Sequence, residues 1–381
     1  MRLLHIADLH IGKRVNEFSM LEDQAYVLDQ IQDMVKERKP DGILIAGDVY
    51  DKTQPSAEAV ELLDDFLTKM SEKNCPIFMI SGNHDSPERL GFGSRIMKKN
   101  GLHIAGVFDG KIQKEVLEDK YGKVNIYMLP FLKPAKVNQY YEEQIETYEE
   151  AIRKVMETAE INKEERNILI AHQFITSGGQ KPEQSDSETL SIGGLDNIDI
   201  SAFDDFDYVA LGHIHRPQKI GRDTIRYAGS PLKYSFSESK HHKSVTLLEI
   251  TEEINIELIP LVPCHDLREI KGPIEKLLKI GREDKEFYLD YIHATLTDEG
   301  EIYDAIGQLR QVYPNLMAMD FDNSRTKQNV NLQGATVAGV AKKTPIELFG
   351  EFFQMQNNND LTKAEAEIMK SIFEQVGGES I

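Results

Sequence analysis

The sequence contains no apolar run that approaches the roughly 18 residues needed to cross a membrane as a helix. Its N-terminus also lacks the basic-then-apolar pattern of a secretion signal, because residues 3–7 already form a short apolar run typical of a buried strand. Only two cysteines are present, Cys75 and Cys264, which is too few for a disulfide framework. We therefore expect a cytoplasmic protein without a membrane segment.

Basic residues are scarce relative to acidic ones, with 44 Lys and Arg against 64 Asp and Glu and a net charge of -20. Residues 261–381 carry 13 basic and 20 acidic side chains, a net charge of -7, so residues 1–260 carry -13. Affinity for nucleic acid normally depends on lysines and arginines that neutralise phosphates. Neither part is therefore expected to be a DNA-binding module by charge alone. Any DNA binding must come from a local patch, from metal ions or from a partner.

Hydrophobic residues make up 40% of the 381 residues, which is enough for a buried core in two or three domains. Apolar strands at 42–46 and 76–80 alternate with amphipathic helices at 19–38 and 56–73. Crossovers of this length predict a largely parallel sheet in an α/β domain. Further helices are predicted at 88–99 and 138–160.

Prolines 260 and 263 flank the expected end of this first domain, which we place at residues 1–260. A small α+β unit is predicted for 261–325, followed by a linker and C-terminal helices over 326–381. Within the small unit the pattern predicts helix, strand, helix and strand at 272–280, 286–295, 300–311 and 315–321.

Five apolar runs end in side chains that bind metals. Because parallel strands end at the same edge of a sheet, these side chains should gather along that edge. Oxygen and imidazole donors without thiolate suit a pair of divalent ions better than a structural zinc. The strand ends carry Asp8 and His10, then Asp48, Asn83 and His84, His172, and finally His213 and His215.

Each of these motifs also has an ordinary structural interpretation. His172 can be a hydrogen-bonded core histidine, Gly-His-x-His can be a turn, and Gly-Asn-His-Asp can be an Asx-turn. We favour the metal site because five such motifs follow five strands in succession. The glycines before Asp48, Asn83 and His213 are expected to relax the backbone where it turns sharply into the site.

Motif by motif, the sequence resembles the calcineurin-like metallophosphoesterases. The matching motifs are Asp8-x-His10, Gly47-Asp48-x-x-Asp51, Gly82-Asn83-His84-Asp85, Ala171-His172 and Gly212-His213-x-His215. The resemblance implies an α/β fold: a β-sandwich flanked by helices, with a small α+β capping domain and a C-terminal helical pair.

The resemblance also implies the site. One ion would be held by Asp8, His10 and His215, and the other by Asn83, His172 and His213. Asp48 would bridge the two ions, which are usually manganese in this family. His84 matches a catalytic histidine that is not a ligand.

The loop Gln184–Glu188 and the run Gly229–Phe236 are most similar to the DNA-repair nucleases of this family. That similarity implies a nuclease acting on duplex ends and hairpins, with an ATPase partner that carries a coiled coil. It further implies a homodimer within a heterotetramer.

The implied chemistry is hydrolysis of a phosphodiester. His84 is expected to contact the phosphate or to protonate the leaving oxygen, and Asp51 either orients His84 or caps a turn before Thr53. Seven basic residues are candidates for phosphate contacts, although each can equally be a solvated surface charge. They are Lys13, Arg14, Arg89, Arg216, Lys233, Lys240 and Lys243.

Two other functions compete with a nuclease. The first is a phosphatase or phosphodiesterase for a non-DNA substrate. Phosphoprotein phosphatases of this fold usually have Arg-Gly after the second aspartate, whereas Lys52-Thr53 follow Asp51 here. The second is an inactive scaffold, which should have lost ligands, and none is missing.

The C-terminal residues carry two Thr-x-x-Glu helix starts, at Thr344 and Thr362. Helices this short are marginal in isolation, so their apolar stripes must dock on something. The stripes include Ile346, Phe349, Phe353, Ile368 and Ile372. They dock either on the chain's own domains or, as we favour, on a helix of the ATPase partner.

Overall fold

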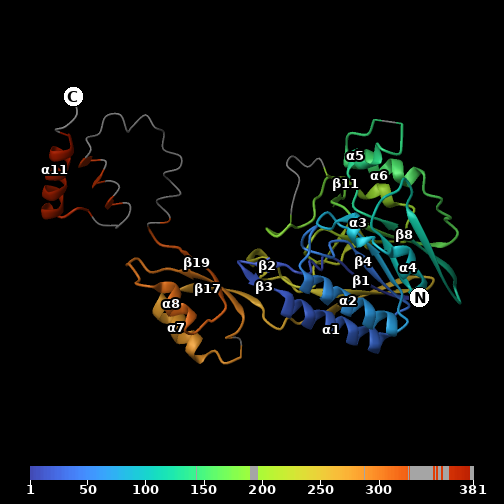
Figure 1. Ribbon diagram of the computed structural model, residues 1–381, viewed down its shortest axis with the longest axis horizontal. Helices are drawn as coiled ribbons and strands as arrows, with labels where there is room; N and C mark the ends of the chain where they lie inside the picture. The colour runs from blue at the N-terminus through green and yellow to red at the C-terminus, as the bar shows by residue number, and fades with distance from the viewer. Residues whose placement is uncertain are drawn as a thin grey trace. The chain divides into compact units, whose positions relative to one another are not determined.

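The computed structural model describes residues 1–142, 144–188, 196–286, 288–324, 326, 346–347, 349–350, 353–354 and 360–377. It divides into two compact units, residues 1–267 (unit 1) and 268–381 (unit 2) (Figure 1). None of the described helices is long and apolar enough to span a membrane. Both cysteines are free. Thr344, one of the two predicted helix starts, lies outside the described residues.

Unit 1 contains two six-stranded sheets. In the first, β1, β4, β5 and β6 run parallel, and β15 and β16 continue the sheet antiparallel beyond β1. Leu4 of β1 lies opposite Ile43 of β4, which in turn lies opposite Ile77 of β5. In sheet order the strands are β16 Ile254–Pro260, β15 Ser244–Ile250, β1 Arg2–Ile6, β4 Gly42–Ala46, β5 Ile77–Ile80 and β6 Leu102–Ala105.

The second sheet also has four adjacent parallel strands, but unlike the first it has an antiparallel strand at each edge. The strand–helix alternation thus correctly predicts parallel inner strands, but it misses edge strands whose side chains are partly charged. In sheet order the strands are β13 Gln218–Ile220, β14 Arg222–Tyr227, β12 Tyr208–Gly212, β9 Arg166–His172, β8 Gly122–Leu129 and β7 Gln113–Asp119.

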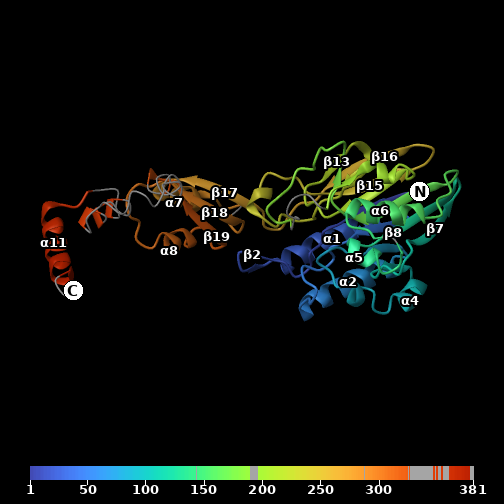
Figure 2. The ribbon, with the colours of Figure 1, turned by 90° about the horizontal axis from the view of Figure 1, so that it is seen from above.

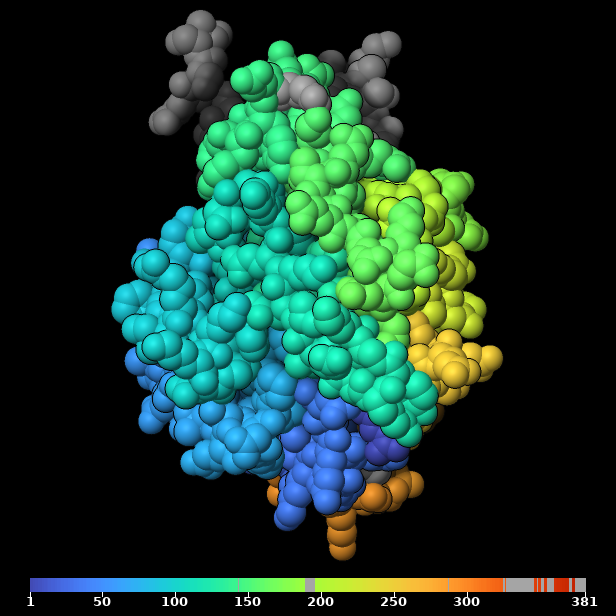
Figure 3. Space-filling view, turned by 90° about the vertical axis from the view of Figure 1, so that its right-hand side faces the viewer, coloured from blue at the N-terminus to red at the C-terminus, as the bar shows by residue number. Residues whose placement is uncertain are grey.

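The two sheets face each other across one apolar core, in which Leu3, Leu44 and Phe78 of the first sheet meet Ile126 and Ile168 of the second. Helix α6 (Tyr148–Glu157) covers the outer face of the second sheet through Ala151, Ile152 and Val155. Helices α1 (Leu21–Arg38) and α2 (Ala57–Glu72) lie side by side along the first sheet (Figures 1 and 2). The blue, teal and green first half of the chain covers most of the face of unit 1 in Figure 3.

Two predicted helices are shorter than expected. In place of 138–160 the structure has α5 (Pro134–Val137) and α6, because the Asn138 side chain bonds the main chain of Ile145 and closes a loop. A capping box between Thr147 and Glu150 then starts α6. In place of 88–99 it has α3 (Pro87–Leu90) and α4 (Ser94–Met97), separated by Gly93 at φ 73°.

Several short elements complete unit 1, and the sequence pattern does not predict them. Two of them form a small hairpin before α1, and two others form a parallel pair after β9. They are β2 Arg14–Val15, β3 Phe18–Ser19, β10 Ile175–Thr176, β11 Ile198–Asp199 and the 3-10 helices Lys98–Asn100 (η1), Ile200–Phe203 (η3) and Phe236–Glu238 (η4).

Unit 2 packs two helices on a three-stranded sheet of order β17-β18-β19, with Ile292, Leu309 and Tyr313 in its core. The predicted helix–strand–helix–strand order is present, and β17 is an additional strand before it. The elements are β17 Leu267–Gly272, α7 Ile274–Glu283, β18 Tyr291–Leu296, α8 Ala305–Arg310, β19 Leu316–Phe321 and, near the C-terminus, α11 Lys363–Gly377.

Candidate metal centre

The predicted ligands come together at one end of the sandwich in unit 1. They follow the carboxyl ends of β1, β4 and β5 in the first sheet and of β9 and β12 in the second. The sequence argument expected one sheet edge, whereas two facing sheets supply the site. Buried side chains at the site include Asp8, His10, Asp48, His172, His213 and His215, while Asn83 and His84 are partly exposed.

The backbone is strained where these strands end. Asp8, His10, Asp48 and His213 all have positive φ angles, of 53°, 44°, 49° and 103°. For a residue with a side chain this conformation costs about 1–3 kcal/mol, and such residues cluster at functional sites. Main-chain bonds help to hold it, because the N–H of His10 donates to the carbonyl of Asp48 at 2.9 Å. The strain is therefore concentrated at residues whose side chains can bind metals.

The three glycines before the motifs serve two purposes. Gly47 has φ 84°, so its role is the conformational one that was predicted. Gly82 and Gly212 are needed for space instead: a Cβ on Gly82 would lie 2.1 Å from Asp48 Oδ1, and one on Gly212 would lie 2.0 Å from the Ala46 carbonyl oxygen. These two glycines allow the strand ends to approach one another closely.

Asp8, His10 and His215 form the first group of candidate ligands. Their candidate ligand atoms lie within 4.8 Å of one another. The Nε2 atoms of His10 and His215 face each other at 3.1 Å. Asp8 accepts the N–H of His213 through Oδ1 at 2.8 Å, while its buried Oδ2 has no hydrogen-bond partner among the described residues. A buried carboxylate oxygen left over beside two imidazole nitrogens fits a divalent cation.

Asn83, His172 and His213 form the second group. Asn83 Oδ1 lies 3.0 Å from His172 Nε2 and 3.0 Å from His213 Nδ1. The other nitrogen of His172, Nδ1, is 2.8 Å from the Ala46 carbonyl oxygen, to which it can donate. That bond leaves the Nε2 lone pair of His172 directed at the site, as in metal-binding histidines generally.

Asp48 lies between the two groups. Its Oδ2 is 3.6 Å from His10 Nε2 and 3.3 Å from His172 Nε2, so one carboxylate oxygen approaches a ligand of each group. Its Oδ1 accepts the N–H of His84 at 2.8 Å. This is the position that a bridging carboxylate would occupy.

The electrostatics of these buried carboxylates also favour bound cations. Burial raises the pKa of Asp8, and the neighbouring Asp48 adds to that increase. Burial acts against ionisation of Asp48 too, but His172 nevertheless holds the pKa of Asp48 below its usual range. Although burial favours a neutral imidazole, Asp48 raises the pKa of His172 to about 9. Without metal, a proton on His172 thus compensates a buried negative charge that divalent ions can neutralise instead.

His84 lies beside the site but is held differently from the prediction. Its Nδ1 is 3.0 Å from the main-chain carbonyl oxygen of Asp51, rather than from the Asp51 carboxylate. The Asp51 carboxylate instead pairs with Lys13 Nζ at 2.8 Å and lies 3.7 Å from His10 Nδ1. Of the two roles considered for Asp51, contact with His84 is thus present, but the main-chain carbonyl makes it and the carboxylate does not.

The side chains that support His215 were not predicted in that role. Ser187 Oγ lies 2.7 Å from His215 Nδ1 and donates to Glu238 Oε1 at 2.5 Å. Lys243 Nζ donates to Glu238 Oε2 at 2.5 Å, and both of these residues are buried. Burial opposes ionisation of Glu238, yet Lys243 holds its pKa below the usual value. Glu188 accepts the N–H of His215 at 2.7 Å.

These contacts determine the tautomer of His215. Because Ser187 donates to Glu238, its oxygen is available to accept the Nδ1–H of His215, which leaves Nε2 unprotonated toward the site. The loop Gln184–Glu188 was noticed in the sequence only through its resemblance. Glu238 carries no sequence signal, because charged residues in polar segments are normally solvated. Lys243 was predicted only as a candidate for phosphate contacts, and its buried pair with Glu238 corrects that prediction.

Most of the predicted phosphate-binding residues are already engaged within unit 1. Lys13 pairs with Asp51, and Lys233 pairs with Asp266 at 2.8 Å. Arg216 forms an ion pair with Glu183, and Arg14 donates to the carbonyl of Glu17. Arg89 is exposed on α3.

The predicted partner-binding residues divide into two sets. Phe349 contacts Phe353 and Phe373 through their rings, with centroids 6.3 and 6.1 Å apart, so Phe349 packs against α11. Ile368 and Ile372 on α11 are 61% and 43% exposed. Ile346 is partly buried.

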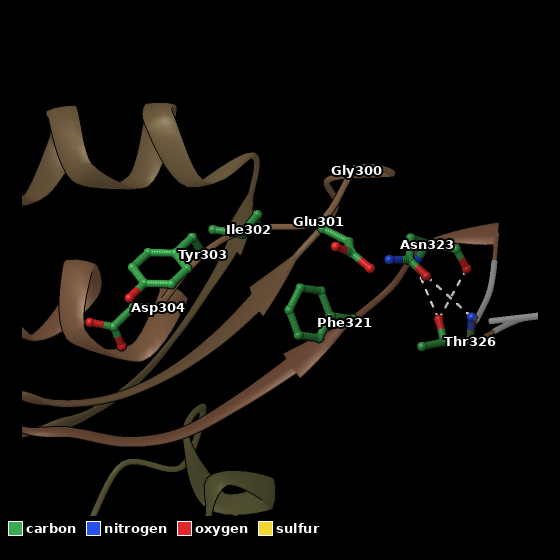
Figure 4. A pocket seen from close by; sticks show the side chains of 8 residues that line it. All are labelled: Gly300, Glu301, Ile302, Tyr303, Asp304, Phe321, Asn323 and Thr326. Atoms are coloured by element: carbon green, nitrogen blue, oxygen red, sulfur yellow. Dashed lines mark hydrogen bonds between the residues drawn. The ribbon is translucent and has the colours of Figure 1, made fainter. Parts of the chain in front are cut away.

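Two cavities flank the metal centre. One, of about 640 Å³, is lined by Asp51–Gln54 with Asn83 and His84, and another, of about 400 Å³, adjoins Asn83 from the side of Phe131. A further cavity lies in unit 2, where Tyr303, Phe321 and Asp304 are among the lining residues (Figure 4). That cavity has no imidazole in its lining, so it does not resemble the metal centre chemically.

Comparisons with known proteins agree with this geometry. The model of the calcineurin-like phosphoesterase family matches residues 1–217. A second model, described as the type 5 capsule protein repressor C-terminal domain, matches residues 263–357. The chain is 35% identical over 386 aligned residues to the D component of the nuclease SbcCD from Staphylococcus epidermidis, with 98% of each chain covered.

Two solved structures are more distant. The protein TT1561 of Thermus thermophilus is 13% identical, with a TM-score of 0.39, over 68% of this chain and 98% of its own. The phosphoesterase Yfce of E. coli is 14% identical, with a TM-score of 0.26, over 65% of this chain and 88% of its own. At these scores neither structure adds to the argument.

Proposed function

The chain belongs to the calcineurin-like phosphoesterase family and, within it, to the family of SbcD, the D component of the SbcCD nuclease, and from this premise we propose that it is a metal-dependent nuclease that hydrolyses phosphodiester bonds of DNA. The observation that carries the proposal is the position of Asp48, whose Oδ2 approaches His10 in one ligand group and His172 in the other. Together with Asp48, six other oxygen and nitrogen side chains supply a donor set for two divalent ions.

We assign one ion to Asp8, His10 and His215, the other to Asn83, His172 and His213, and the bridging position to Asp48. The ions are proposed to be manganese. Such a pair supplies Lewis acidity, which lowers the pKa of a water and stabilises the attacking and leaving oxygens of a phosphodiester. The protein's part is to hold these side chains rigidly, through strained strand ends and through Ser187 and Ala46 behind the histidines.

His84 is proposed as the acid of the reaction. Its Nδ1 is fixed on the Asp51 carbonyl, and its main chain is fixed on Asp48, so Nε2 is the nitrogen left to meet substrate. In its protonated form Nε2 can hydrogen-bond a phosphate oxygen and donate its proton to the leaving oxygen as the P–O bond breaks. Asp51 would assist by holding both His84 and Lys13.

The substrates are proposed to be duplex ends and hairpins, cleaved in the cytoplasm in DNA repair and recombination together with an SbcC-type ATPase. We place the contact with the coiled coil of that ATPase on the C-terminal helices, where Ile368 and Ile372 are exposed apolar side chains. Two chains would form a homodimer within a heterotetramer. A phosphodiesterase for a non-DNA substrate is not favoured, because the relative is matched over 98% of its length, including the part equivalent to unit 2.

A nuclease assay tests the proposal. The purified chain, with and without an SbcC-type ATPase, is incubated with hairpin and duplex DNA in the presence of manganese or of a chelator. We expect manganese-dependent cleavage that the ATPase alters. Hydrolysis of a small phosphodiester such as methyl 4-nitrophenyl phosphate without cleavage of any DNA would favour the alternative.

A further inference from the structure

The cavity of about 400 Å³ beside Asn83 has a lining unlike that of the metal centre. It lies between the loop after β5 and the segment after β8, and its volume falls within the range of small-ligand sites. Asn83, a proposed metal ligand, forms part of its wall. Phe108, Phe131, Lys133 and Lys136 also line it.

The aromatic part of this lining is fixed close to the ligands. The Phe131 ring is partly exposed and meets the ring of His172 edge-on, with centroids 6.2 Å apart. The N–H of Phe131 donates to the carbonyl of Ser81 at 2.9 Å, which ties the segment to the end of β5. Phe108 is buried and contacts the ring of Tyr140 at 5.6 Å. An aromatic surface thus lies in direct contact with His172, a proposed metal ligand.

Two lysines give the same cavity a positive rim. Lys133 is exposed, and Lys136 lies over the Tyr140 ring at 5.4 Å and donates to Gln139 at 3.3 Å. Neither lysine forms an ion pair with another residue in the part of the chain that the structure describes. Lys13, Arg216 and Lys233, by contrast, are already paired with acids.

The acidic side chains in the lining do not cancel this rim. Asp85 is buried, and its carboxylate accepts the N–H groups of Val49, Tyr50 and Gly82. Glu88 is exposed and is the other acid among the lining residues. The lining thus carries two lysines against one exposed acid, in a chain whose net charge is -20.

We propose that this cavity is a subsite for one unpaired nucleotide of the DNA strand next to the scissile phosphate. The base would lie against Phe131, and Lys133 and Lys136 would contact the flanking phosphates, the combination by which proteins hold single-stranded nucleic acid. The inference rests on the proposed nuclease function. It specifies the substrate further: strands whose nucleotides near the cut are unpaired, as at frayed ends and hairpin tips, bind better than paired ones.

The test compares Phe131→Ala with the full-length wild type on two substrates under manganese. One is a single-stranded oligonucleotide, and the other is methyl 4-nitrophenyl phosphate, a diester with no base. Because stacking on an aromatic side chain is sequence-tolerant and substantial, we expect KM for the oligonucleotide to rise about 10-fold or more. Hydrolysis of the small diester and bound manganese should remain within about twofold of wild type, and Phe131→Tyr should restore KM.

Two matched variants control for position and charge. Tyr121→Ala removes an exposed aromatic ring just before β8, outside the lining of the cavity. This variant should hydrolyse both substrates as wild type does. Lys133→Gln combined with Lys136→Gln should raise KM for the oligonucleotide and weaken its salt dependence. An abasic nucleotide next to the cut should mimic Phe131→Ala, and combining the two should cost little more than either alone.

The outcomes separate the subsite from the proposed function. An unchanged KM for the oligonucleotide in Phe131→Ala, or equal losses on both substrates with loss of manganese, would overturn the subsite, since Phe131 would then act only through His172. Additive effects of Phe131→Ala and the abasic site would do the same. Absence of hydrolysis of both substrates by the wild type would overturn the nuclease proposal itself.

Discussion

Ser187 Oγ lies 2.7 Å from Nδ1 of His215, and the same oxygen donates to the buried carboxylate of Glu238 at 2.5 Å. Ser187 and Glu238, 51 positions apart in the sequence, thus determine which nitrogen of a proposed metal ligand carries its proton. Lys243 compensates the charge of Glu238, so the arrangement does not leave a buried carboxylate unpaired.

Removing this hydroxyl should weaken metal binding. In Ser187→Ala we expect manganese affinity at the site to fall about 10- to 100-fold, the usual cost of losing a group that orients a metal-binding histidine. Manganese titration followed by calorimetry measures the affinity, independently of activity. Ser187→Thr keeps the hydroxyl and should bind nearly as wild type, and an unchanged affinity in Ser187→Ala would show that His215 does not depend on this contact.

His84 and Asp51 should behave differently from each other when substituted. His84→Ala should keep both ions and lose turnover by about 10²- to 10⁴-fold, as expected for a positioned acid. Asp51→Asn should lose far less, because His84 is held by the main-chain carbonyl of residue 51. Metal content and kcat are measured for both variants. Loss of metal in His84→Ala would make His84 a ligand and contradict the mechanism.

His5 should contribute to the pH dependence of stability. It is buried between Tyr208 and the carbonyl of Leu211, and burial lowers the pKa of His5 to about 3. Its unfolded pKa is about 6.5, so the unfolded state binds more protons below that pH and folding stability falls as the pH falls through 6.5. The stability advantage of wild type over His5→Gln should therefore shrink by about 1 kcal/mol between pH 7.5 and 5.5.

Denaturant unfolding of the metal-free proteins at both pH values measures this difference. The other histidines are common to wild type and variant, so their contributions cancel in the comparison. A difference in unfolding free energy that is constant with pH would mean that His5 binds protons equally in the folded and unfolded states, so that burial does not lower its pKa.

The C-terminal helices should be needed for the partner and not for chemistry. Replacing Ile368 and Ile372, which are exposed on α11, with serine should abolish association with an SbcC-type ATPase. Manganese content and cleavage of single-stranded DNA should remain close to wild type, because both residues belong to unit 2 and the metal centre to unit 1. Co-purification and metal analysis provide the measurements. Retained association would show that the tail has another docking site.

The positions of the proposed ligands were predictable from sequence for a specific physical reason. A short apolar run such as residues 3–7 is typical of a buried strand, and a polar residue directly after it, such as Asp8, then lies at the strand's end. That argument needs no knowledge of packing. The same argument does not reveal that two facing sheets supply the site. Sheet membership depends on which strands pair: β1 pairs with β15 in the first sheet, and β9 pairs with β12 in the second.

The supporting residues could not be predicted in the same way. Glu238 lies in a 3-10 helix and Lys243 just before β15, and in sequence both look like solvated charges. Only the fold buries them together behind His215. The predicted helix over 138–160 failed for a related reason, since the side chain of Asn138 closes a loop that helical periodicity does not register.

The most direct test of the two-metal site is the metal content of Asp48→Ala. Asp48 Oδ2 is 3.6 Å from His10 Nε2 and 3.3 Å from His172 Nε2, so we assign it to both ions. Elemental analysis after equilibration with manganese should find two ions per chain in the wild type. The folded variant, checked by circular dichroism, should bind well below two and should not cleave DNA. Two ions still bound per chain in folded Asp48→Ala would contradict the bridging assignment.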